Sequence, residues 1–146
     1  MSEESPGREE QIADIAVKLV AYIEAQTGDA VPAPADVSAD SLDAAFSALD
    51  AALDQLTDLA AVYGADRLQA IEPLVLPIAA LAGEYFVHGA GATWVEPVID
   101  ADTTLIVALP GGVAVDLTGA VRASLMSGVS NLRVMAARLI APESAP

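Results

Sequence analysis

The first regular pattern in the chain is a stripe of apolar residues between residues 10 and 28. It recurs every three or four positions, which predicts an amphipathic helix, and its members are Ile12, Ile15, Leu19 and Ile23. Gly28 follows where a left-handed residue commonly ends a helix. We expect residues 1–9 to be disordered, because they are polar and contain a proline and a glycine.

A second, longer stripe follows a proline-rich segment. Residues 29–39 contain Pro32 and Pro34, which cannot continue a helix, and we expect a linker there. Asp40 or Ser41 can then cap a helix that extends to about residue 63. Its apolar residues alternate spacings of four and three, as in a heptad seam: Leu42, Phe46, Leu49, Leu53, Leu56 and Ala60.

Two prolines divide the next apolar stretch. Pro73 and Pro77 predict a short helix and a turn up to Leu76, and then a separate helix from Pro77 to His88. Gly83 lies inside this second helix, where it costs about 1 kcal/mol relative to alanine. A glycine at that position indicates the close approach of another backbone, most simply that of the sheet that follows.

The pattern then changes from helical to strand-like. We expect a three-stranded antiparallel meander with strands at 93–98, 104–109 and 113–117. The turn Pro110-Gly111-Gly112 separates the last two. Two short helices should follow, capped by Thr118 and Ser130. The predicted class is therefore α+β, with N-terminal helices packed on the sheet, a main domain at 40–140 and a disordered tail at 141–146.

Charge excludes some functions. The 146 residues carry a net charge of −15, and only six are Lys or Arg. Binding of nucleic acid relies on basic side chains that neutralise phosphates, so we expect no nucleic-acid partner and no membrane partner. Cysteine is absent, which excludes disulfides and thiolate chemistry. The N-terminus is acidic and polar rather than basic and then apolar, and we expect a soluble, cytoplasmic protein.

Residues 77–127 resemble a family of small bacterial domains of unknown function. In that family a helix ending in a Gly-Glu pair leads through a glycine corner to a strand that contains tryptophan. The matching residues are Gly83, Glu84, Gly91, Trp94, Asp116, Leu117 and Val121. The resemblance implies the fold of this region and brings no activity with it.

Glu84 and His88 are the clearest candidates for chemistry. They lie four residues apart, so a carboxylate and the only imidazole of the chain share one helix face and could share a proton or a metal. Glu96, Asp100 or Asp102 would have to complete a metal site. The alternative is that Glu84 forms a local structural contact. We predict no catalytic residue and no metal. We also predict no cofactor, since the glycine corner lacks the lysine of a phosphate loop.

Two further features are candidates for a partner surface. Trp94, the only tryptophan, could anchor a partner, although a single Trp in a domain with few aromatic residues is more often part of the core. Asp50, Asp54 and Asp58 form an acidic stripe that could meet a cation or a basic partner, or could simply be solvated.

These observations favour a non-enzymatic interaction module that binds a protein partner or itself. One alternative is a small-ligand or metal-dependent site around Glu84 and His88. Another is an acidic inhibitor or immunity-type protein that blocks the site of a basic partner.

Overall fold

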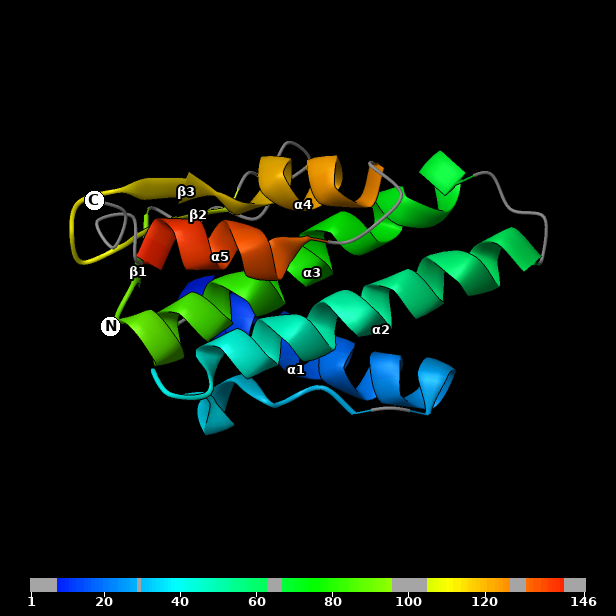
Figure 1. The fold of residues 1–146 in the computed structure, drawn as a ribbon, viewed down its shortest axis with the longest axis horizontal. Coiled ribbons are helices and arrows are strands. Elements are labelled where there is room, and N and C mark those ends of the chain that lie inside the picture. Colours follow the sequence, from blue (N-terminus) through cyan, green and yellow to red (C-terminus); the bar gives the residue numbers. More distant parts are fainter. Residues whose placement is uncertain (1–7, 29, 63–66, 96–104, 127–130, 141–146) are drawn as a thin grey trace, which may run out of the picture.

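The computed structural model describes residues 8–28, 30–62, 67–95, 105–126 and 131–140 (Figure 1). Within these residues the fold is α+β, as predicted. In chain order, longer N-terminal helices are followed by a three-stranded antiparallel sheet and then by shorter C-terminal helices. The elements are α1 (Arg8–Thr27), the 3-10 helix η1 (Pro34–Asp36), α2 (Leu42–Val62), α3 (Arg67–Ala90), β1 (Thr93–Trp94), β2 (Ile106–Ala108), β3 (Ala114–Asp116), α4 (Leu117–Met126) and α5 (Leu132–Ile140).

Helix α3 is the centre of the fold. It contacts α1, α2, α4, η1 and the first two strands, and every residue from Ile78 to Phe86 is buried. A helix segment that is apolar on all sides is stable only when it is covered on all sides, and the segment from Ile78 to Phe86 meets that condition. Among the described residues, one segment, Pro73–Ala90, is long and apolar enough to cross a membrane by length and composition alone, and 61 % of it is buried inside the protein.

The prediction of a break before Pro77 was wrong. Both Pro73 and Pro77 lie inside the continuous helix α3. Each proline removes one amide donor from the helical ladder. The burial of α3 after these positions, from Ile78 to Phe86, offsets that loss, and such tertiary packing cannot be read from local sequence.

The N-terminal helix and the segment after it pack against the rest of the protein. Residues 8 and 9, expected to be disordered, begin α1, while residues 1–7 and 141–146 lie outside the described part of the chain. Gly28 has a φ of 80° and ends α1 as predicted. In the proline-rich segment Val31 and Val37 are buried, and the carbonyl oxygen of Pro32 accepts a hydrogen bond of 2.7 Å from the Tyr85 hydroxyl.

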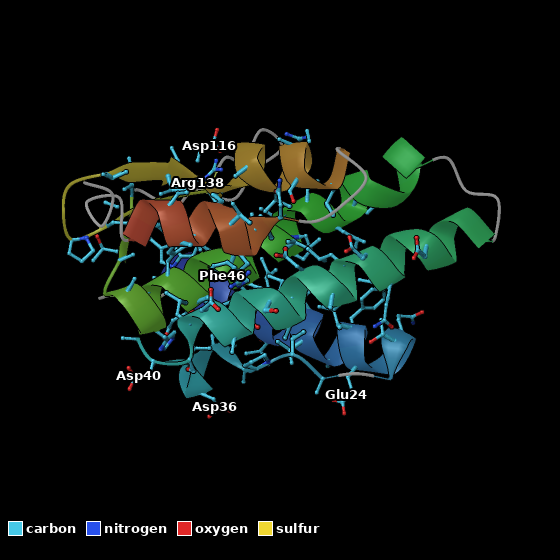
Figure 2. The ribbon with its side chains drawn as sticks, viewed as in Figure 1. Glu24, Asp36, Asp40, Phe46, Asp116 and Arg138 are labelled. Atoms are coloured by element: carbon cyan, nitrogen blue, oxygen red, sulfur yellow. The ribbon has the colours of Figure 1, made fainter. Side chains whose placement is uncertain are left out.

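The apolar stripe of α2 faces the core, as its spacing predicts. Its buried members are Leu42, Phe46, Leu49, Leu53 and Leu56. Phe46 points into the interior of the protein (Figure 2). Its ring centroid lies 5.5 Å from that of Tyr85 and 5.1 Å from that of Phe86. These three rings join α2 to the middle of α3.

The meander has the predicted strand order, β1-β2-β3, but the strands are shorter. Trp94, Val107 and Val115 are direct cross-strand neighbours and all three are buried. They form the buried face of the sheet, of which β1 and β2 contact α3. Val113, which the predicted strand at 113–117 included, is instead exposed and precedes β3. The predicted turn at 100–102 lies outside the described residues.

The cap of the first C-terminal helix differs from the one predicted. Asp116, rather than Thr118, caps α4, since its Oδ1 accepts a 2.9 Å hydrogen bond from the Gly119 amide. The Thr118 hydroxyl instead accepts the amide of Leu105 at 2.9 Å. The cap of α5 comes from Asp50 on α2, and Ser130 lies outside the described residues.

Candidate functional site

Glu84 is a buried carboxylate on the last turns of α3. Only 6 % of its surface is exposed. Burying a charged group is costly unless hydrogen bonds replace the lost water, and the Nε1–H of Trp94 donates one to Oε2 of Glu84 at 2.8 Å. This hydrogen bond therefore joins the carboxylate on α3 to the indole on β1.

His88 approaches the other oxygen of the same carboxylate. Its Nε2 lies 3.5 Å from Oε1 of Glu84, and 39 % of its side chain is exposed. The two residues share one helix face, as their spacing predicts. Both oxygens of Glu84 thus face a side chain of the protein itself, and the imidazole lies between this buried carboxylate and solvent.

Gly83 explains how Trp94 can lie so close to α3. A Cβ atom at residue 83 would overlap the indole ring and would lie 2.7 Å from Cδ1 of Leu117. The sheet does approach α3 at this glycine, but the nearest atoms belong to a side chain of β1 and to one of α4, and not to the backbone that was predicted. Trp94 itself is only 9 % exposed. It belongs to the core, and in this position it presents little surface to a partner.

The residues around Glu84 do not assemble a set of metal ligands in the described part of the chain. No group of three or more His, Asp or Glu side chains comes together there. Glu96, Asp100 and Asp102 lie outside the described residues. In the glycine corner, Gly89 belongs to α3, while Gly91 has a φ of 75° and makes the turn into β1.

The three aspartates of α2 have different environments. Asp50 is half-buried, and its Oδ1 and Oδ2 each accept a backbone amide, from Leu132 and Arg133 respectively, at 2.9 Å. Asp54 is half-buried and engaged within the protein, whereas Asp58 is exposed. The stripe therefore does not form one continuous solvent surface.

A second contact between the same helices supports this arrangement. Nε of Arg133 on α5 lies 2.9 Å from Oδ1 of Asp43 on α2, and both side chains are largely exposed. Asp43 and Asp50 together bind the first turn of α5.

An apolar groove lies between α1 and the first half of α3. It has a volume of about 330 Å³ and is lined by Ile15, Lys18, Leu19, Tyr22, Leu74 and Pro77. Four of these residues follow the helical spacing of i, i+3, i+4 and i+7 along α1. The sequence pattern was interpreted as a core stripe, and the part of it that contains Leu19 is indeed buried. Sequence reasoning therefore missed the groove, and the exposed Tyr22 next to this stripe was the available signal.

Tyr85 is the described residue whose titration is most altered. Its ring is fully buried, and burial raises the pKa of the phenol well above its ordinary value. The hydroxyl therefore stays protonated and acts as a donor to the Pro32 carbonyl. This is a structural role, and it joins the proline-rich segment to α3.

No protein-family model, curated protein or solved structure matches this chain. The resemblance of residues 77–127 to a small bacterial domain family therefore stays a prediction.

Proposed function

We propose that this protein is a non-enzymatic interaction module that binds a basic protein partner. The observation that carries the proposal is the environment of Glu84. Both of its oxygens face side chains of the protein, Trp94 and His88, in a buried position. That arrangement suits the joining of β1 to α3 better than it suits acid–base chemistry on a substrate.

The charge distribution supports a basic partner. The chain carries a net charge of −15, and Figure 2 shows Glu24, Asp36 and Asp40 projecting from the lower edge of the molecule as drawn. All three are exposed. A surface of one sign attracts partners of the opposite sign and speeds their association, more strongly at low salt.

The proposal is tested by affinity capture from the native source, with the purified protein as bait. A variant carrying Glu24→Gln, Asp36→Asn and Asp40→Asn removes three charges with little change of shape. Its matched control, Glu24→Asp, Asp36→Glu and Asp40→Glu, keeps the charges. We expect a stoichiometric basic protein that binds the wild type and the control, binds the neutral variant more weakly and is released by salt.

Two results would contradict the proposal. Recovery of the bait alone at low salt would exclude a stable complex. Turnover or binding of a small molecule that is lost in both Glu84→Gln and His88→Ala, with the fold intact, would favour the small-ligand or metal-dependent site instead.

A further inference from the structure

We infer that the groove between α1 and α3 is the docking site for a cationic amphipathic helix of the partner. This inference rests on the proposed function and adds to it a particular surface and a particular shape of ligand. The groove is apolar in its lining, apart from Lys18 and the hydroxyl of Tyr22. Grooves of this kind between two helices commonly receive the apolar face of a third.

The geometry of the groove fits a helix better than a compact cofactor. Its α1 wall consists of Ile15, Lys18, Leu19 and Tyr22, which span two helical turns. Its volume of about 330 Å³ is at the lower end of the range of roughly 300–1,000 Å³ for small-molecule pockets. That space suits a few apolar side chains that enter from one direction.

The protein already covers a comparable helix surface elsewhere. The short helix α5 lies along α2, with Leu132 and Ala136 buried and Met135 half-buried. In contrast, Tyr22 on α1 remains 44 % exposed although it lines an apolar surface. Tyrosine is among the residues that contribute most to binding energy when a partner covers them.

Charge decides among the possible occupants. A second copy of the chain would carry the same net charge of −15 as a whole, and the overall field of the protein would repel it, as it would an anionic amphiphile. Lys18 does not reverse this preference, because its ammonium already lies 3.0 Å from the carboxylate of Asp14. The apolar face of an amphipathic helix matches the apolar lining of the groove, and a basic opposite face matches the negative net charge of the protein.

The experiment uses the full chain and three synthetic peptides whose binding is measured by fluorescence anisotropy. The first places leucine and lysine on opposite faces of a helix, the second has the same composition in scrambled order, and the third replaces every lysine by glutamate. Two protein variants are compared: Tyr22→Ser in the groove and Val17→Ser, which removes an apolar side chain that is 56 % exposed outside the groove. Circular dichroism and urea midpoints verify that both variants fold.

We expect the first peptide to bind more tightly than the other two. Tyr22→Ser should weaken it about tenfold, and Val17→Ser should leave it within about twofold. Equal binding of the first and second peptides, unaffected by Tyr22→Ser, would overturn the docking site and leave the proposed function standing. Self-association that Tyr22→Ser abolishes would assign the groove to a second copy and overturn the cationic helix. Failure of every peptide to bind, together with capture of the bait alone, would overturn both proposals.

Discussion

The indole ring of Trp94 occupies the space that a side chain on Gly83 would need. An added Cβ would lie 2.6 Å from Cζ2 of the ring, a separation that real structures do not adopt. The same indole reaches the carboxylate of the next residue, Glu84, through its Nε1–H. Two adjacent residues of α3 therefore fix the position of the tryptophan. The absence of a side chain on Gly83 leaves room for the ring, and the Glu84 carboxylate accepts a hydrogen bond from the indole N–H.

Gly83→Ala should destabilise the protein by about 1–3 kcal/mol, because the new methyl group forces the ring or the helix to shift. This loss should exceed the gain of about 1 kcal/mol in helix propensity. Gly111→Ala is the matched control, since a Cβ there meets no atom within 4 Å, and it should change stability by less than about 0.5 kcal/mol. The check is the free energy of unfolding in urea, and equal stability of the two variants would contradict the packing described.

Trp94→Phe should cost about 1–3 kcal/mol, since it leaves one oxygen of a buried carboxylate without its donor. Glu84→Gln retains an oxygen that can accept the indole N–H and should cost less. Urea unfolding of the two single variants and of the double variant measures their coupling. Strict additivity of the two effects would mean that the 2.8 Å hydrogen bond contributes nothing to stability.

Asp50→Ala should lower stability by about 0.5–2 kcal/mol, the usual cost of losing a helix cap. The control is Asp58→Ala on the same helix, where the aspartate is exposed and an effect within about 0.5 kcal/mol is expected. Both substitutions raise the helix propensity of α2 by the same amount, so their difference isolates the cap. Amide hydrogen exchange in α5 should accelerate only in Asp50→Ala, and slow exchange there would argue against the cap.

Stability should fall as the pH rises above about 10, the ordinary pKa of tyrosine. Burial raises the pKa of Tyr85 in the folded protein, so above that pH the unfolded chain releases the phenolic proton while the folded protein keeps it. The folded state then binds more protons, and its stability decreases with pH. Urea midpoints of the wild type and of Tyr85→Phe, compared at about pH 8 and about pH 11, should show a steeper decline in the wild type. Identical slopes would place the hydroxyl in water.

Local spacing was sufficient to predict much of this fold. The stripes of α1 and α2, the glycine that ends α1 and the order of the three strands all follow from residues close together in sequence. The pairing of Glu84 with His88 also follows, because four residues make one helical turn. In each case the physical cause lies within a few residues of the feature.

What sequence could not predict depends on contacts between distant residues. Pro77 marks a helix start by local rules, and only the burial of α3 keeps the helix continuous through it. The aspartates of α2 look equivalent in sequence, yet Asp50 alone meets the amides of Leu132 and Arg133. The indole of Trp94 could not be assigned to Glu84 because the register of β1 against α3 is a tertiary property.

The cap of α5 also determines when the fold can be completed during synthesis. Asp50 precedes the amides that it binds by 82 and 83 residues, and a helix as short as Leu132–Ile140 is marginal by itself in water. Until residues 131–140 have emerged from the ribosome, α2 therefore lacks its contacts with α5, and Asp50 lacks the amides of Leu132 and Arg133. The cover that α5 provides for α2 therefore forms only after residues 131–140 have been synthesised.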